Sequence, residues 1–289
     1  MRMTGLTPTS VALLVILAAL WGGSFVFMRV AVPALGPVVL AFVRVDVAAL
    51  ALLALAYAQR RFPPFRTRWR DFAIVGVVNS ALPFLLFSYA AQYVTASTGA
   101  ILNATSPFFG AVAAAIWLGE PLTRRKVAGM ALGFVGVAVL VGWHPDTMTR
   151  DTALAIVACL AAALCYALAG TFAKRRLKDV PPFAVATASQ VAAAAALAPA
   201  LPFTSVPGPV TMLVAANVAA LALASTAVAY LIYFKLIADV GPSRALTVTF
   251  LIPLFGVLWG SLFLAEALTP GMAAGGVLIV AGTVLALRG

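Results

Sequence analysis

Two prolines lie near the middle of long apolar stretches of this 289-residue chain, Pro107 and Pro253. A proline inside a helix lacks the backbone N–H, which leaves the carbonyl four residues earlier without its usual donor. Here those carbonyls belong to Asn103 and Thr249. Lipid cannot satisfy them, so either could receive an ammonium group from a solute. The alternative is a packing kink relieved by neighbouring side chains, and for a third proline, Pro83, we favour that interpretation.

Aromatic, hydroxyl and amide side chains lie at a similar depth in several apolar stretches. They suit a cavity that has an apolar body and a few polar anchors, and their rings could stack on a solute or hold a cation. The alternative is that they pack in the core or form an aromatic belt at the membrane interface. Substrate contacts are predicted for Trp21, Ser24, Asn79, Phe84, Asn103, Pro107, Tyr166, Ser225, Tyr230, Thr249 and Pro253.

Charged residues inside apolar stretches are the next candidates, because a charge in lipid is costly and usually functional. Arg44 and Asp46 are two residues apart, so they face different sides of a helix. Asp46 could carry a proton or bind an ammonium group; alternatively, it forms a structural ion pair with Arg29 or Arg44. Glu120 and Glu266 follow apolar stretches and are expected to organise the loops after them rather than to bind a solute.

The sequence does not indicate a metal site, a cofactor or an enzyme. Cys159 and Cys165 are six residues apart in one apolar stretch, on different helix faces, and are expected to be small packing residues. The single histidine, His144, lies in a predicted loop. A phosphate-binding GxxxxGK[ST] motif is missing from the sequence. An intramembrane enzyme would need a nucleophile with a base, paired aspartates or a metal cluster, and a channel would usually show a ring of polar residues.

Composition predicts an all-helical membrane protein. Hydrophobic residues make up 64% of the chain and charged residues 9%, whereas a soluble domain carries roughly 25% charged residues. Each stretch is apolar on every face, which favours helices over alternating membrane strands. A helix crosses the hydrocarbon core with about 20 residues. The predicted spans are 10–30, 37–58, 71–92, 96–118, 124–142, 152–173, 182–201, 210–234, 243–265 and 270–288.

The net charge of +11 is explained by topology rather than by nucleic acid binding. Sixteen of the nineteen lysines and arginines fall on one side if the N-terminus is inside, with Arg150 alone outside and two arginines within spans. This bias predicts a multi-pass protein of the bacterial inner membrane with both termini in the cytoplasm. The first apolar run, from Val11, resembles a signal peptide, but its apolar character continues to Met28, so we expect a retained first helix.

An internal repeat divides the predicted helices into two sets of five. With a shift of 146 residues, Pro107 aligns with Pro253 in an ungapped register. Further aligned pairs include Gly110 with Gly256, Glu120 with Glu266, Thr123 with Thr269 and Gly136 with Gly282. An odd number of helices inverts the second copy, so we predict inverted repeats over residues 1–146 and 147–289. This is an architecture of alternating-access carriers.

Small residues four apart occur in both sets. Gly129 with Gly133 and Gly271 with Gly275 make GxxxG spacings in the fifth and tenth spans, which let helix backbones approach closely. We expect these two spans to pack together as a scaffold. The same spacing would also serve dimerisation, so a monomer or a weak homodimer is predicted.

The repeat resembles a known family. The stretches WGGSFVFMR (residues 21–29), AFVR ending at Arg44 and SPFFGAVAAAIWLGEPLT (106–123) look like one EamA repeat, and IPLFGVLWGSLFLAEALT (252–269) looks like the second. The resemblance covers nearly the whole chain and implies the drug/metabolite transporter superfamily, in its branch of ten-helix exporters. It is similar to bacterial aromatic amino acid exporters.

This resemblance implies a carrier that works without a cofactor by alternating access around a mid-membrane cavity. Its partners are then the lipid bilayer and a small solute, most simply an aromatic or other neutral amino acid. A multidrug, cationic-compound or metabolite exporter of the same fold is the alternative, because the family is broad in substrate.

Overall fold

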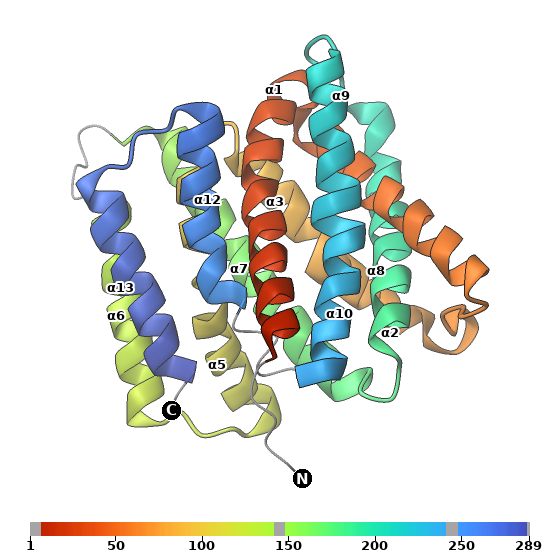
Figure 1. The fold of residues 1–289 in the computed structure, drawn as a ribbon, viewed down its shortest axis with the longest axis horizontal. Helices are drawn as coiled ribbons and strands as arrows, with labels where there is room; N and C mark the ends of the chain where they lie inside the picture. The colour runs from red at the N-terminus through yellow and green to blue at the C-terminus, as the bar shows by residue number, and fades with distance from the viewer. Residues whose placement is uncertain (1–6, 142–147, 241–247, 288–289) are drawn as a thin grey trace.

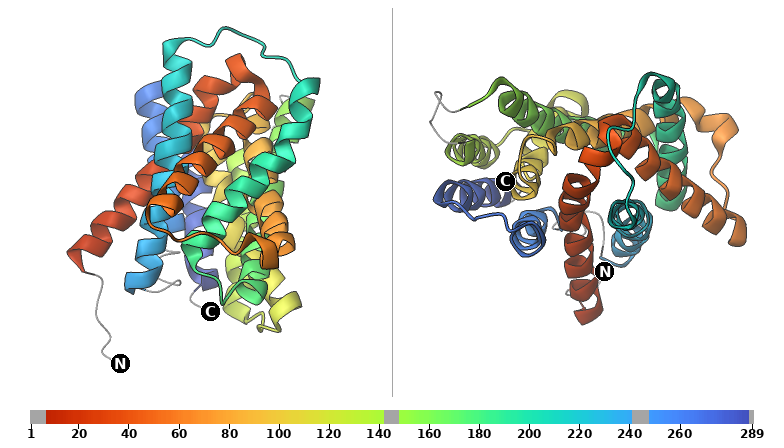
Figure 2. Two further views of the ribbon diagram at one scale, coloured as in Figure 1. Left: turned by 90° about the vertical axis from the view of Figure 1, so that its right-hand side faces the viewer. Right: turned by 90° about the horizontal axis from the view of Figure 1, so that it is seen from above.

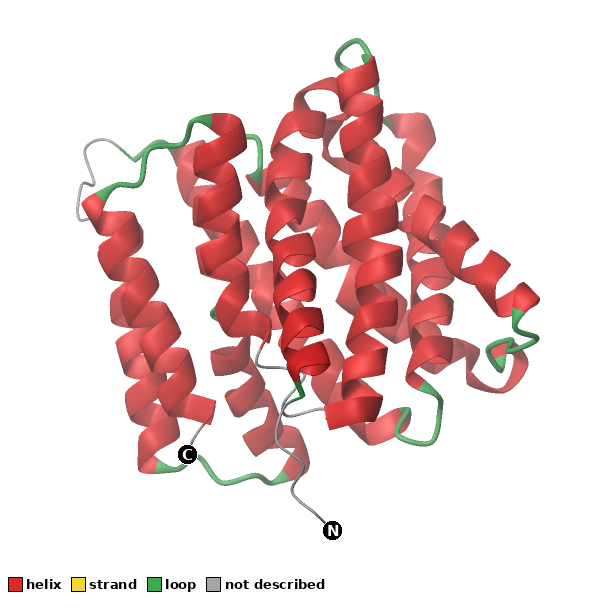
Figure 3. Ribbon diagram, viewed as in Figure 1, coloured by secondary structure: helices red, strands yellow, loops and turns green. Residues whose placement is uncertain are grey.

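The computed structural model describes residues 7–141, 148–240 and 248–287, and all regular structure in these ranges is helical (Figures 1 and 3). Apolar stretches of this length form helices because the backbone then satisfies its own hydrogen bonds in lipid. The described start of the first helix and the end of the last helix lie at the same end of the bundle, the lower end in Figure 1.

The first half of the chain begins with the longest helix, α1 (Pro8–Ala58), which holds two predicted spans. Gly36 divides it, with a φ of 71° in the left-handed region that glycine tolerates best. The other elements of this half are α2 (Phe65–Gly76), the π-helix η1 (Val77–Ala81), α3 (Leu82–Ala90), α4 (Ala96–Asn103), α5 (Ser106–Leu118) and α6 (Arg124–Val141).

The second half begins with a 27-residue helix, α7 (Arg150–Arg176). The elements that follow are α8 (Pro182–Leu197), the 3-10 helix η3 (Ala198–Phe203), α9 (Met212–Ala219), the π-helix η4 (Ala220–Val228), α10 (Ala229–Val240), α12 (Val248–Leu264) and α13 (Pro270–Leu287).

Six helical stretches of the described residues are long and apolar enough to cross a membrane. They are Pro8–Ala58, Phe65–Ala90, Ala96–Leu118, Arg150–Arg176, Pro182–Phe203 and Met212–Tyr233, with Val248–Leu264 and Pro270–Leu285 as shorter apolar helices. The stretch Pro8–Ala58 is α1, which carries two of the predicted spans. Helix α6, the fifth predicted span, is not among the six, and it begins with three basic residues. The count of ten spans stays a prediction.

Helices α6 and α13 lie side by side at one edge of the bundle (Figures 1 and 2). A Cβ on Gly275 would lie 2.6 Å from the carbonyl oxygen of Gly136, and one on Gly282 would lie 2.5 Å from that of Gly129. Only glycine therefore allows this backbone approach. The expected packing of the fifth span against the tenth is confirmed, and these glycines serve contacts within one chain.

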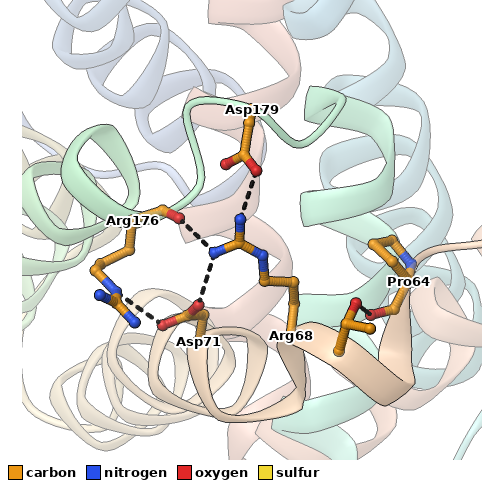
Figure 4. Close-up of polar contacts among 6 residues, drawn as sticks. Pro64, Arg68, Asp71, Arg176 and Asp179 are labelled. Atoms are coloured by element: carbon orange, nitrogen blue, oxygen red, sulfur yellow. Dashed lines mark hydrogen bonds and ion pairs between the residues drawn. The ribbon is translucent and has the colours of Figure 1, made fainter.

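Four charged side chains join the start of α2 to the end of α7 and the turn after it (Figure 4). Arg68 pairs with Asp71 at 3.5 Å and with Asp179, and its Nη1 also donates to the carbonyl of Arg176 at 3.3 Å. Arg176 pairs with Asp71 through Nε, also at 3.3 Å. The Asp71 side chain is only 9% exposed and links both arginines, so it is the centre of this connection between the two halves.

Replacing Asp71 by alanine is expected to destabilise the folded protein by about 1–3 kcal/mol, because both arginines lose a partly buried partner. Asp239→Ala is the matched control: Asp239 pairs with Lys235 four residues earlier on an exposed helix face, a pair worth below about 0.5 kcal/mol. Thermal unfolding in detergent, followed by tryptophan fluorescence, compares the two. Equal midpoints for both variants would contradict the central role of Asp71.

Candidate functional site

A pocket of about 490 Å³ lies between α5, α6 and α7. Its lining is almost wholly apolar: Phe108, Phe109, Val112, Ala113, Ile116, Trp117, Met130, Phe134, Leu164 and Leu168. None of the predicted substrate contacts lines it, and it offers a polar solute no charged side chain and only the indole N–H of Trp117 as a side-chain donor. The candidate site lies elsewhere, where buried polar groups converge.

The centre of the candidate site is Arg44, in the second part of α1, which is 5% exposed. Its Nε donates to Thr226 Oγ1 at 3.1 Å, and its Nη1 contacts the sulfur of Met28 at 3.7 Å. The guanidinium carbon lies 3.6 Å from the centroid of the Phe84 ring, within cation–π range. Tyr166 packs against the apolar cluster that contains Phe84, the side chain that the guanidinium covers.

A network of amide and hydroxyl groups includes Tyr230. Asn79 Nδ2 donates to the Tyr230 hydroxyl at 3.4 Å, and Gln190 Nε2 donates to Ser80 Oγ at 2.9 Å. Ser80 and Gln190 also lie beside the Tyr230 hydroxyl. Gln190 is fully buried, and its Oε1 has no hydrogen-bond partner among the described residues. A buried acceptor without a donor is costly unless a ligand or water supplies one.

These residues form the Arg44 cluster, which comprises Arg44, Asn79, Ser80, Phe84, Tyr166, Gln190, Thr226 and Tyr230. They come from α1, η1 and α3 in the first half, and from α7, α8, η4 and α10 in the second. Arg44 lies eight residues after Gly36, so it is about 12 Å along the helix from that turn at 1.5 Å per residue.

Two π-helical segments supply much of the polar surface of the Arg44 cluster. The segment η1 carries Asn79 and Ser80, and η4 carries Ser225 and Thr226. The shift of 146 residues aligns these two pairs, so both copies of the repeat widen at the same place. A π-helix leaves the regular i→i−4 ladder and is most often found at functional sites. Thr226 shows this locally, because its hydroxyl donates to the carbonyl of Leu221, five residues earlier, at 2.9 Å.

The structure brings four of the predicted substrate contacts together in the Arg44 cluster: Asn79, Phe84, Tyr166 and Tyr230. Three other predicted contacts, Trp21, Ser24 and Ser225, have surroundings outside the Arg44 cluster. Trp21 packs on Tyr233 with ring centroids 5.4 Å apart, and Ser225 donates to the carbonyl of Leu20 at 2.6 Å. The Ser24 hydroxyl is buried without a partner among the described residues.

The expectation that Pro107 leaves the Asn103 carbonyl free is wrong. Asn103 ends α4, and Pro107 lies in the first turn of α5, where the missing N–H of a proline costs nothing. The hydroxyl of Ser106 donates to the Asn103 carbonyl at 2.7 Å, so this carbonyl already has a donor. Pro253 is buried within α12, as predicted for a proline inside a helix, and the role of Thr249 stays a prediction.

The structural ion pair expected for Asp46 does not form with either arginine. Across the described residues, no basic group lies within 4.0 Å of the half-buried Asp46, while Arg29 Nη1 donates to the carbonyl of Ala91. The spacing explains the result: successive residues turn by about 100° on a helix, so Asp46 points away from the buried face that holds Arg44. A role for Asp46 in coupling stays a prediction.

Four members of the Arg44 cluster were not among the predicted substrate contacts: Ser80, Thr226 and Gln190, and Arg44 itself, which was predicted only for coupling or an ion pair. Gln190 could have been found from the sequence: its amide lies inside a 16-residue apolar helix, and burying it in a membrane is as unfavourable as burying the amide of Asn79. Ser80 and Thr226 carry a weaker signal, since hydroxyls in membrane helices commonly bond to their own backbone.

Comparison with known proteins identifies the family of the chain. A model of the EamA-like transporter family matches residues 9–142 and 153–288. The chain belongs to the EamA family. This family is part of the drug/metabolite transporter superfamily, so the EamA protein described here is a multi-pass membrane transporter.

Relatives of this EamA protein match over nearly its whole length. An uncharacterized transporter of Archaeoglobus fulgidus is 25% identical over 273 residues, which cover 93% of this chain and 95% of the relative. An uncharacterized transporter of Bacillus subtilis is 26% identical over 285 residues, covering 93% and 88%. A protein of Streptantibioticus cattleyicolor named "Probable terminal-alkyne amino-acid exporter" is 29% identical over 282 residues, covering 95% and 92%.

Among the solved structures that match this chain is a crystal structure with the same fold. It superposes with a TM-score of 0.68 at 19% sequence identity, and the match covers 97% of both chains. At this identity the likeness concerns the fold alone.

Proposed function

We propose that this EamA protein is a secondary exporter in the bacterial cytoplasmic membrane that carries small organic solutes, with amino acids as its cargo. Its ten spans form two inverted repeats, residues 1–146 and 147–289, with both termini in the cytoplasm. The solute binds in the Arg44 cluster, and the repeats expose this site to one side of the membrane at a time. The protein acts as a monomer in the bilayer and needs no cofactor.

The observation that carries this proposal is the Arg44 cluster itself. It joins side chains from both halves of the chain inside a bundle of apolar helices, where unsatisfied polar groups are expensive and usually functional. An amino acid is a zwitterion and needs donors at one end and an acceptor at the other. Arg44 offers the donors, and Gln190 Oε1 offers an acceptor without a partner among the described residues.

Two further findings support the proposal. One relative that spans most of the chain is named as an amino-acid exporter. The glycines that could have served dimerisation are used between α6 and α13 of one chain, which favours the monomer.

Transport into liposomes that contain the purified protein tests this function, with labelled amino acids and one cationic dye as probes. We expect amino acid flux, and a drop of about tenfold or more for Tyr230→Phe, because a solute-binding hydrogen bond in the membrane interior is lost. Tyr57→Phe is the matched control, since Tyr57 is 74% exposed and remote from the Arg44 cluster.

The outcomes separate the alternatives. Flux of the dye alone would make the protein an exporter of cationic compounds. Flux of neither probe would contradict transport of these solutes, and an equal effect of the two tyrosine variants would place the binding site elsewhere.

A further inference from the structure

Arg44 is a buried cation without an anion. Burial removes the guanidinium from water, which is unfavourable unless an opposite charge or a full set of hydrogen bonds replaces it. Across the described residues, no carboxylate lies within 4.0 Å of Arg44. Most acidic residues are occupied elsewhere: Asp71, Glu120, Asp179 and Asp239 pair with other basic groups, and Glu266 accepts from backbone and hydroxyl donors.

The donors of Arg44 are also mostly unused. A guanidinium has five N–H groups. One of them, on Nε, reaches the hydroxyl of Thr226, and one on Nη1 reaches the thioether of Met28, which is a weak acceptor. In the part of the chain that the structure describes, no group accepts from Nη2. One N–H of Nη1 and both of Nη2 are therefore left for a ligand, and a carboxylate can bind these two terminal nitrogens with its two oxygens.

We propose that Arg44 binds the carboxylate of the transported solute, so that the carrier selects solutes that have a carboxylate over amines and amides that lack one. This inference rests on the proposed function and specifies its substrate class. Tyr166 packs against the same apolar cluster as Phe84, whose ring lies against the guanidinium. The Tyr230 hydroxyl accepts from Asn79. We expect these two hydroxyls to complete the carboxylate site as neutral donors.

The same geometry disfavours a cationic solute. The Phe84 ring face, which the sequence offered as a cation–π surface, is already covered by the guanidinium at 3.6 Å. A second cation beside it would meet an unscreened like charge in a medium of low dielectric constant. The ring instead holds one face of the guanidinium and leaves its edge, where the N–H groups point, for an anion.

Access to Arg44 requires the helices around it to separate, because only 5% of the residue is exposed. The groups that cover it come from both halves of the chain, with Phe84 on α3 and Thr226 on η4. Movement of one repeat against the other would separate these covering groups and expose the guanidinium to a solute.

The first test needs no variant. In liposomes, labelled L-phenylalanine and L-leucine are measured in competition with L-phenylalaninamide, which lacks the carboxylate, and with N-acetyl-L-phenylalanine, which keeps it and lacks the ammonium group. We expect N-acetylphenylalanine to compete at least tenfold better than phenylalaninamide. Better competition by the amide would overturn the inference while the proposed function stands. If neither amino acid crosses the membrane in the wild-type protein, the proposed function fails, and this inference fails with it.

The second test uses Arg44→Gln and Arg44→Lys, with Arg29→Gln as the matched control. Arg29 is also on α1, but it binds the backbone carbonyl of Ala91 outside the Arg44 cluster. We expect Arg44→Gln to lower amino acid flux about 100-fold and to remove the preference for N-acetylphenylalanine, whereas Arg44→Lys keeps the preference with weaker binding. A folded Arg44→Gln protein, judged by gel filtration, that retains both flux and preference would overturn the inference.

Discussion

Replacing Gly256 by alanine is expected to destabilise the folded protein by about 3 kcal/mol, while the same change at Gly110 leaves it at least as stable. The two glycines are equivalent under the 146-residue repeat. Their surroundings differ: a Cβ on Gly256 would lie 2.2 Å from the Cβ of Ala100 on α4, whereas a Cβ on Gly110 would meet nothing within 4 Å.

The collision at Gly256 has no cheap relief, because the atom that it meets is attached directly to a helix backbone. On the other side, α12 lies against Gly22 of α1, where a Cβ would come within 2.9 Å of the Gly256 nitrogen. Three helices therefore meet at these glycines. An added methyl group must push whole helices apart, which also separates the buried residues packed around them.

Gly110 is the matched control because it lies inside α5, in open space. Alanine is the better helix former there, by up to about 1 kcal/mol. The unfolding midpoint in detergent, followed by tryptophan fluorescence, should fall by about 5 °C or more for Gly256→Ala and hold or rise for Gly110→Ala. Similar midpoints for both variants would contradict the three-helix contact at Gly256.

The elements of the fold could be predicted from the sequence where length and apolarity alone decide them. The expected span 152–173 lies within α7, and the expected span 96–118 coincides with the stretch from α4 to α5. The break at residues 104–105 within that stretch agrees with the proline kink that the sequence offered as the alternative for Pro107, with the Asn103 carbonyl relieved by the Ser106 hydroxyl. Its form as two separate helices was not predicted, because it depends on packing around Ala104.

The candidate site could be predicted only as a set of costly residues. Asn79, Tyr166 and Tyr230 were found because polar groups stand out in apolar helices. Which of them meet depends on how each helix is rotated and where η1 and η4 widen, and helices that are apolar on every face do not encode their rotation locally. Arg44 shows the limit: its charge was visible, but the absence of an acidic partner near it in the described chain became evident only with the structure.

Positions that are equivalent under the 146-residue repeat differ in their structural surroundings. The position of the break between α4 and α5 corresponds to residues 250–251, which are continuous helix in α12. Gly110 and Gly256 differ in the same way. In a carrier built from inverted repeats, one repeat moves against the other when the site changes sides, so equivalent positions are expected to differ in their contacts in any one state. The asymmetry therefore agrees with the proposed mechanism.

Glu266 is the second position at which we expect a substitution to lower stability much more than the same substitution at its equivalent in the other repeat, Glu120. Its carboxylate accepts from the backbone nitrogens of Ala96 and Ser97 at 2.7 and 3.0 Å, and from the Ser97 hydroxyl at 2.6 Å. It thus caps the N-terminus of α4, where unpaired N–H groups and the helix dipole favour a negative charge. Gly260 leaves the room for it, since a Cβ there would lie 2.5 Å from Glu266 Oε2.

Glu120, its equivalent in the first repeat, has only lysine partners among the described residues, at 2.9 Å for Lys174 and 4.0 Å for Lys126. Its hydrogen bond with Lys174 holds the pKa of the Glu120 carboxyl below its usual value. Both the carboxyl and Lys174 are well exposed, so the pair contributes little to stability.

Glu266→Ala is therefore expected to destabilise the protein by about 2–3 kcal/mol, because three donors lose a charged acceptor at once, while Glu120→Ala changes stability by less than about 1 kcal/mol. Glu266→Gln should fall between them, since the amide keeps one oxygen but turns an NH₂ group toward the donors of α4. Unfolding midpoints in detergent give the order. If Glu120→Ala lowered the midpoint as much as Glu266→Ala, the hydrogen bonds of Glu266 to the N-terminus of α4 would contribute no more to stability than the exposed ion pair of Glu120.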